Sequence, residues 1–372
     1  MKNIVKILIG CCLIHLCIGS IYAISVLYPK AVELSGWDNS VLVTGFSLTI
    51  LSLGISASLH QRWFKGWHIV SVLLWAAIMW ALSSLNLVYN FSSREFNEVI
   101  HYLCSIWLGV AIGILYVVPI NIMTAHKSNA TTSGLVVFCF GLGSILAAAK
   151  LFKICELGNL MLVGVLVYTI ILLLGIFLIH RGLPENNRIT YSNSFKRNKI
   201  WYILAAVFFL NIGIGISLLS NLTQLSLDKG YLLDDAIVLV ALAGLANTLG
   251  RFVYPILSDL RGSKLEILCY ITDLQTLAIM LAIFNNSLWN LCVILILSVY
   301  GGVFALMPSL LKQLYKDSNA YSQILIMWGF AGLICPIIFN MLGIFALLFM
   351  STLIILLLSY CILQYKFTVK LP

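Results

Sequence analysis

Twelve long apolar stretches, each about 20 residues, constrain the fold of this chain more than any other feature. They cover residues 7–28, 38–60, 67–89, 99–123, 132–152, 158–180, 200–225, 236–257, 265–283, 288–312, 320–342 and 345–365. A stretch of this length can cross a bilayer only as a helix, because every backbone N–H and C=O needs a partner inside the segment. The sequence therefore predicts an all-α membrane protein with twelve transmembrane helices.

Composition and charge agree with a membrane protein. Only 9% of the 372 residues are charged, against about 25% in soluble domains. The net charge of +9 could indicate nucleic-acid binding, but the basic residues are distributed by side. With the N-terminus inside, 16 Lys and Arg fall in inner loops and tails and 5 in outer loops. This bias predicts a multi-pass protein of the cell (inner) membrane, in contact with lipid rather than nucleic acid, with both termini cytoplasmic.

A polar segment divides the chain into two similar halves. Residues 181–199 are expected to form a cytoplasmic linker loop between six-helix bundles at 1–180 and 200–372. Short patterns recur between the halves at offsets of 196 and 189 residues: Gly54 and Gly66 match Gly250 and Gly262, and Gly113–Pro119 matches Gly302–Pro308. Two parallel six-helix repeats resemble the major facilitator superfamily, in which the halves rock about a substrate bound between them.

Arg251 is the only charged residue from Ala236 to Ser258. A charge inside a membrane helix costs about 2.5–3.5 kcal/mol on insertion scales, so its side chain should face a polar group or a ligand. Asn247, Arg251 and Pro255 share one helix face at i, i+4 spacing, and a guanidinium matches the geometry of a carboxylate. Arg251 lies about 7 Å to the cytoplasmic side of the centre of the span. A cytoplasmic gate, or a bond to helix-end carbonyls, therefore remains the alternative to ligand binding.

The segment "PILSDLRGSK" follows Arg251 and resembles the inner-loop signature of the superfamily, G-x3-D-R-x-G-R-K. Asp259, Gly262 and Lys264 match it, while Pro255 stands where glycine is usual. The resemblance implies a gating loop that closes the inner side through charge pairs. In the first half Trp63 takes the place of the acid, so this half is expected to have a degraded lock.

Four segments narrow the resemblance to the oxalate:formate antiporter family: "IGSIYAISVLYP", "GILYVVP", "SGLVVFCFGLGS" and "LANTLGR". The resemblance implies that Arg251, Tyr22 and Tyr116 enclose a carboxylate substrate. Oxalate-transporting members carry a second cation, a lysine, where Trp328 aligns in "YSQILIMWGFAG". One arginine facing an indole suits a monocarboxylate with an apolar body better than oxalate.

His15 and Asp273 are candidates for proton coupling, because each is a titratable group inside an apolar segment. The alternatives are a neutral histidine bonded to a neighbouring helix and a structural bond for the acid. Gly109 and Gly113 form a small-xxx-small pattern that favours close helix packing over a direct role in function.

The sequence thus predicts a secondary transporter of a small organic anion, by antiport or proton symport, acting as a monomer. No acid pair, phosphate loop or metal-ligand spacing is present, so neither an enzyme nor a cofactor or metal is expected. A proton-coupled carrier of a zwitterion such as an amino acid remains an alternative, and so does a non-transporting sensor on the same scaffold.

The orientation gives the first testable prediction. A single cysteine at Ser192, in an otherwise cysteine-free background, should escape impermeant thiol reagents in intact cells and react after permeabilisation. Labelling of Ser192→Cys in intact cells would overturn the inside placement of the linker.

Overall fold

The computed structural model describes residues 2–22, 38–92, 97–126, 129–151, 157–190, 196–317 and 319–368. Its helices are α1 (Lys2–Ile18), α3 (Asn39–Trp63), α4 (Ile69–Ser92), α5 (Glu98–His126), α6 (Ala130–Leu151), α7 (Leu157–Gly182), α8 (Lys199–Asp228), α9 (Leu233–Arg261), α10 (Lys264–Phe284), η2 (Asn286–Leu288), α11 (Trp289–Tyr315), α12 (Asn319–Ile324), α13 (Ile326–Leu342) and α14 (Ile344–Thr368). Within the described residues, twelve spans are long and apolar enough to cross a membrane. The predicted all-α architecture of twelve transmembrane helices is confirmed.

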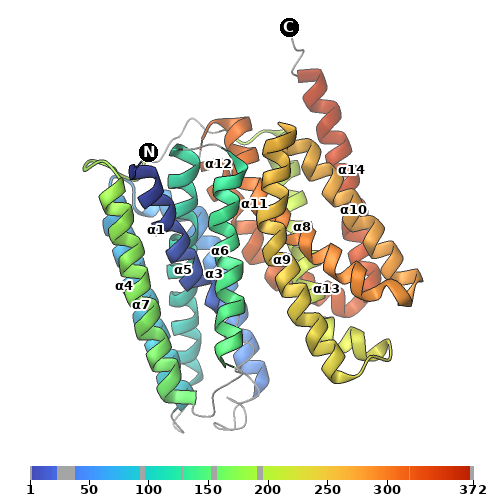
Figure 1. Cartoon of the computed structure of the whole chain (residues 1–372), viewed down its shortest axis with the longest axis horizontal. Helices are drawn as coiled ribbons and strands as arrows, with labels where there is room; N and C mark the ends of the chain where they lie inside the picture. The colour runs from blue at the N-terminus through green and yellow to red at the C-terminus, as the bar shows by residue number, and fades with distance from the viewer. Residues whose placement is uncertain are drawn as a thin grey trace. The chain divides into compact units, whose positions relative to one another are not determined.

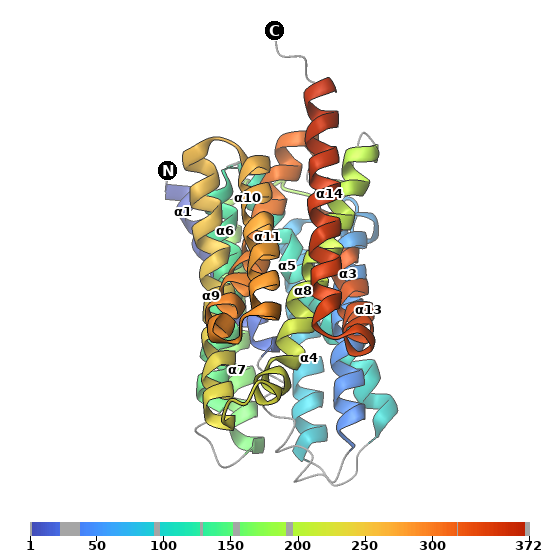
Figure 2. The ribbon, with the colours of Figure 1, turned by 90° about the vertical axis from the view of Figure 1, so that its right-hand side faces the viewer.

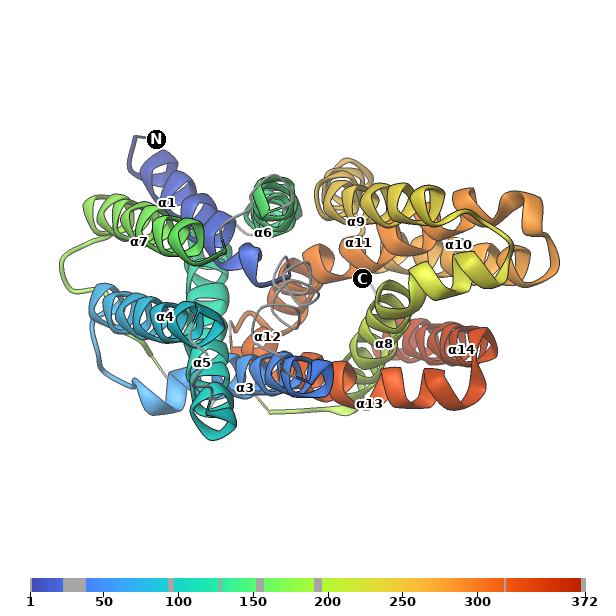
Figure 3. The ribbon, with the colours of Figure 1, turned by 90° about the horizontal axis from the view of Figure 1, so that it is seen from below.

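Contacts divide the chain into two compact units (Figure 1). The first contains residues 1–128 and 135–192, and the second contains residues 129–134 and 193–372, so the start of α6 clusters with the second unit. In the first unit, α5 packs against α1, α3 and α4, and α7 packs against α1 and α4 (Figure 3). In the second, α11 packs against α9 and α10, while α8 packs against α13 and α14 (Figure 2).

Glycines allow the closest helix pairs to form. A methyl group on Gly109 or Gly113 of α5 would run into side chains and carbonyl oxygens of α3, which confirms the predicted close packing. The equivalent pair of the second unit, α9 and α11, is equally close. Gly250 lies against the backbone carbonyl of Ser298, and Gly301 lies against that of Asn247.

The loops after α3 and α9 each contain a left-handed glycine: Gly262 directly follows α9, and Gly66 lies three residues after the end of α3. Gly66 has a φ of 83° and Gly262 a φ of 74°, a left-handed conformation that glycine adopts without strain. The two glycines that match by the offset of 196 residues thus also share a backbone conformation.

The polar segment after α7 is attached to the first of these loops. The backbone N–H of Gly66 donates to the carbonyl of Ile189, and the N–H of Ile189 donates to the carbonyl of Trp67, both at 2.9 Å. Arg188 Nη1 donates to the carbonyl of Gly66 at 2.9 Å, and Ile189 is buried. We call residues 187–189 the strap. Ser192 lies outside the described residues.

The predicted span at 320–342 is interrupted. Helix α12 ends at Ile324 and α13 begins at Ile326, with a tighter i→i+3 hydrogen bond from the N–H of Trp328 to the carbonyl of Leu325. Such a local tightening in a transmembrane helix changes the direction of the side chains that follow. Here it directly precedes Trp328.

The glycine contacts give a stability prediction. Gly250→Ala should lower the thermal unfolding temperature, because the added methyl meets the Ser298 carbonyl and overpacking costs about 1–3 kcal/mol. Gly164→Ala in α7 is the matched control, since a methyl there meets no atom within 4 Å. Thermal unfolding in detergent measures both variants. Equal unfolding temperatures would show that the close approach of α9 and α11 is not tight.

Candidate functional site

Arg251 lies inside the helix packing of the second unit. It belongs to the second half of α9 and is only 3% exposed. Its guanidinium carbon lies 5.5 Å from the ring centroid of Phe304 on α11. The electron-rich face of a ring attracts a cation, by about 2 kcal/mol where water is excluded. The buried charge therefore rests on an aromatic surface of the neighbouring helix.

Phe304 connects Arg251 to the tryptophan expected from the sequence. Its ring centroid lies 4.9 Å from that of Trp328 on α13, with the planes at 74°. The ring centroid of Phe304 also lies 5.1 Å from that of Phe208 on α8. The rings of Phe304, Trp328 and Phe208 are all buried. Arg251 and Trp328 thus belong to one cluster, but through Phe304, which the sequence reasoning missed. Phe304 lies within the repeated pattern Gly302–Pro308, which was the feature of the sequence that could have pointed to it.

Asn247 lies one turn before Arg251 and is half-buried. Both its backbone carbonyl and its side-chain oxygen lie where a methyl on Gly301 would sit, so it too faces α11. Pro255, the third residue of the predicted face, lies against Gly134 instead. Asn247 and Arg251 are therefore brought to one helix interface.

The first unit holds its own aromatic cluster. The His15 ring lies 5.1 Å from Tyr116, Tyr116 lies 5.4 Å from Phe140, and Phe140 lies 5.7 Å from Tyr22. His15 is fully buried, with Nδ1 3.1 Å from the carbonyl oxygen of Cys11 on the same helix. The structure thus brings the three predicted first-half residues together and adds Phe140 on α6, which the sequence does not predict as a site residue.

The two clusters share a repeated aromatic pair. Tyr116 and Phe140 meet at 84°, and Phe304 and Trp328 meet at 74°. Both members of the second pair follow those of the first by 188 residues. The edge-to-face pair from the fourth and fifth segments of each half is therefore an internal repeat, one residue away from the offset of 189 found by pattern.

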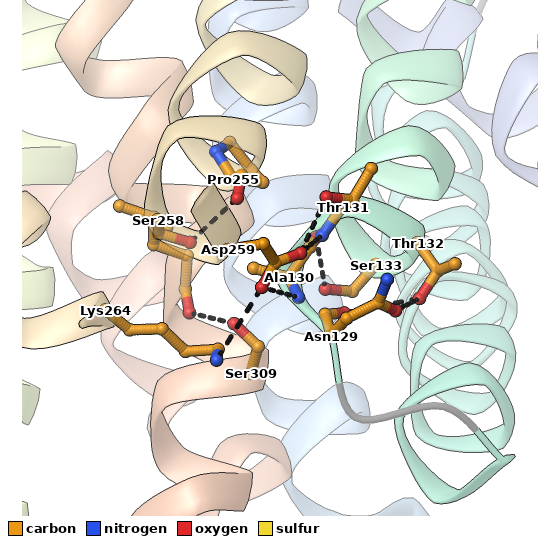
Figure 4. A network of polar contacts seen from close by, with 11 residues as sticks. Asn129, Ala130, Thr131, Thr132, Ser133, Pro255, Ser258, Asp259, Lys264 and Ser309 are labelled. Carbon is orange, nitrogen blue, oxygen red and sulfur yellow. Dashed lines mark hydrogen bonds and ion pairs between the residues drawn. The ribbon is translucent and has the colours of Figure 1, made fainter. Parts of the chain in front are cut away.

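Asp259 caps the first turn of α6 (Figure 4). Its carboxylate accepts hydrogen bonds from the backbone N–H groups of Ala130 at 3.0 Å and Thr131 at 2.7 Å, and from the Thr131 hydroxyl at 2.6 Å. Lys264 Nζ lies 3.8 Å from Asp259 Oδ1. The side chain of Lys264 is 13% exposed and that of Asp259 is 23% exposed. Gly262 supplies the left-handed turn between them. The matched residues of the inner-loop signature thus hold a helix N-terminus, where a negative charge is favoured.

Asp273 lies apart from both clusters. It is exposed, on the side of α10 opposite the residues that pack into the second unit. No hydrogen bond or ion pair joins its carboxylate to another described side chain. Among the described residues, no group of three or more His, Cys, Asp or Glu could hold a metal ion.

Comparison with solved structures identifies the fold. The chain is similar to the transporter FucP in its outward conformation, the E. coli fucose:proton symporter, with a TM-score of 0.79 at 14% identity over 98% of this chain and 99% of that one. It is also similar to the proton:xylose symporter XylE bound to 6-bromo-6-deoxy-D-glucose, with a TM-score of 0.72 at 13% identity over 98% and 96%. A bacterial homologue of the iron transporter ferroportin in its outward-facing state gives 0.71 at 13% identity over 98% and 100%.

These matches establish the major facilitator fold, and all three structures are transporters rather than enzymes. No protein-family model matches the sequence, and no curated protein matches it. The narrower resemblance to the oxalate:formate antiporter family is therefore not confirmed.

The capping geometry predicts unequal effects of two charge removals. Asp259→Ala should speed amide exchange in residues 129–134 by about tenfold, because loss of a helix cap costs about 0.5–2 kcal/mol. Lys264→Gln should change it little, since a partly exposed pair contributes about 0–1 kcal/mol. Hydrogen–deuterium exchange by mass spectrometry measures both. A larger effect of Lys264→Gln would mean that the ion pair, not the cap, holds this turn.

Proposed function

We propose that this chain is a secondary active transporter of a small organic anion, with a monocarboxylate as substrate. The major facilitator fold supports transport by alternating access, with residues 1–180 and 200–372 as the two repeats and 181–199 as the cytoplasmic linker. The observation that carries the anionic substrate is the buried guanidinium of Arg251 against Phe304.

A buried arginine suits carboxylate recognition. Its guanidinium stays charged, and its N–H donors form a planar fork that matches two carboxylate oxygens. Asn247, one turn away on the same face, adds an amide that can donate a further hydrogen bond. Lysine at position 251 would keep the charge but lose the fork, so the two side chains are not equivalent here.

The aromatic neighbours favour one negative charge over two. At an effective dielectric of about 20 and about 4 Å, an ion pair is worth about 4 kcal/mol, so an unmatched second carboxylate forfeits energy of that order. Phe304 and Trp328 instead offer apolar ring faces, with one indole N–H donor, to a methyl or short alkyl group. This supports formate, acetate, lactate or pyruvate over oxalate.

The first unit supplies the remaining proposed roles. The family resemblance gives Tyr22 and Tyr116 a part in substrate binding, and their membership of one cluster with His15 supports it. Histidine changes charge at about pH 5 to 8, so we assign proton coupling, if transport is symport, to His15. Asp273 does not join this cluster.

Two alternative functions are a carrier of a zwitterion, which differs in its substrate, and a sensor, which binds a ligand without transporting it. A zwitterion such as an amino acid would use Arg251 for its carboxylate but needs an acceptor for its ammonium group. A sensor would bind the same anions without moving them. Binding and uptake must therefore be measured separately, and a neutral sugar must be included because two matched structures are sugar symporters.

Competition in proteoliposomes tests the proposal. Uptake of labelled pyruvate or acetate should be inhibited by unlabelled monocarboxylates at least tenfold more strongly than by oxalate, alanine or fucose. Arg251→Lys should reduce uptake strongly. Phe304→Leu should weaken binding more than Phe208→Leu, a matched loss from the same ring cluster without the contact to Arg251.

Trp328→Lys completes the test, because it adds the second cation and should shift preference toward oxalate. If oxalate competes as well as acetate in the unmodified protein, the single-cation argument is wrong. Binding without uptake, followed by quenching of tryptophan fluorescence, would favour the sensor.

A further inference from the structure

Asp273 is a carboxylate at the centre of a membrane-spanning helix. It is residue ten of the 21 in α10, and its side chain is exposed. The opposite face of α10 is buried, and there Gln275 receives a hydrogen bond from Asn211 at 3.1 Å and donates one to the Ile296 carbonyl at 3.3 Å. The packing of α10 is therefore complete without Asp273, which points out of the unit.

The neighbours of Asp273 on this face are large and apolar or aromatic. Tyr270 is 63% exposed and Leu277 54%, and towards the end of the helix Met280 is 44% and Phe284 77% exposed. Together with Asp273 they form a stripe at alternating spacings of three and four residues, which we call the α10 face. This spacing places side chains along one side of a helix, as in helix–helix seams.

The described outward face of α7 lacks such a charge. On α7, the exposed residues Val163, Ile170 and Phe177 are apolar and need only lipid around them. A carboxylate at the same depth is costly in hydrocarbon unless a cation or hydrogen-bond donor reaches it. The α10 face therefore differs from an ordinary lipid-facing surface by one group that needs a partner.

Charge decides what kind of partner fits. A second copy of this chain would bring the same acid to a symmetric α10 contact, which places like charges together. A helix with a lysine or arginine at matching depth would neutralise the acid and fill the seam beside Tyr270 and Leu277. We propose that the α10 face docks a transmembrane helix of another membrane protein that carries one basic residue at mid-membrane depth.

A model helix tests this inference with the full-length protein in phospholipid vesicles. The probe is a leucine-rich transmembrane peptide with one central lysine, labelled for energy transfer from a dye at the C-terminus of the protein. It should bind about tenfold more tightly than the same peptide with a central leucine. This preference should disappear in Asp273→Leu and in Asp273→Asn.

Glu266→Gln is the matched control, because Glu266 is an exposed acid in the first turn of the same helix, away from mid-depth. It should leave the preference unchanged. Equal binding of the two peptides, or a preference that survives both Asp273 variants, overturns the proposal. Asp273-dependent energy transfer between two labelled copies of the protein, with no preference for the lysine peptide, would also overturn it and identify a second copy as the occupant.

Discussion

The close approach of α9 and α11 is the constraint on which the candidate site depends. Gly250 and Gly301 remove the side chains that would hold these helices apart, so backbone meets backbone at Ser298 and Asn247. Arg251 lies one turn after Asn247 on α9, and Phe304 lies about one turn after Gly301 on α11. The close contact of the two helices therefore brings Arg251 to Phe304. Two glycines thus position a guanidinium over a ring, and that ring carries the contact on to Trp328 on a third helix.

Hydropathy was sufficient to predict the fold, because lipid allows only helices that satisfy their own backbone, and segment lengths then follow. Arg251 and Asp273 were visible for the same reason, as charges in apolar runs. Phe304 and Phe140 were not, because an aromatic residue in such a run resembles its many apolar neighbours, and the repeated Gly302–Pro308 pattern that contains Phe304 does not mark which of its residues meets Arg251. Which of the many buried rings meets Arg251 depends on the rotation of α11 about its axis, and only the packing fixes that. The break before Trp328 also lacked a signal, since neither glycine nor proline marks it.

The internal repeat has kept its packing and changed its chemistry. The edge-to-face pair recurs in both units at one offset, but the basic group beside it does not. In the first unit it is His15 on α1, a group that can gain or lose a proton. In the second it is Arg251 on α9, which stays charged. A duplicated aromatic scaffold with one fixed and one titratable base fits the proposed function, in which Arg251 would bind the anion and His15 would respond to protons.

The inner loops show the same divergence. Both contain a left-handed glycine. Before the second loop, Asp259 at the end of α9 caps α6, while an exposed Trp63 takes the matching position at the end of α3. The first loop is held instead by the strap, through backbone hydrogen bonds and the buried Ile189. Dissolved ions screen an exposed charge but not a backbone hydrogen bond. The missing acid in the first half therefore corresponds to a different kind of interaction. Backbone hydrogen bonds join the first loop to the strap, whereas a carboxylate holds the second.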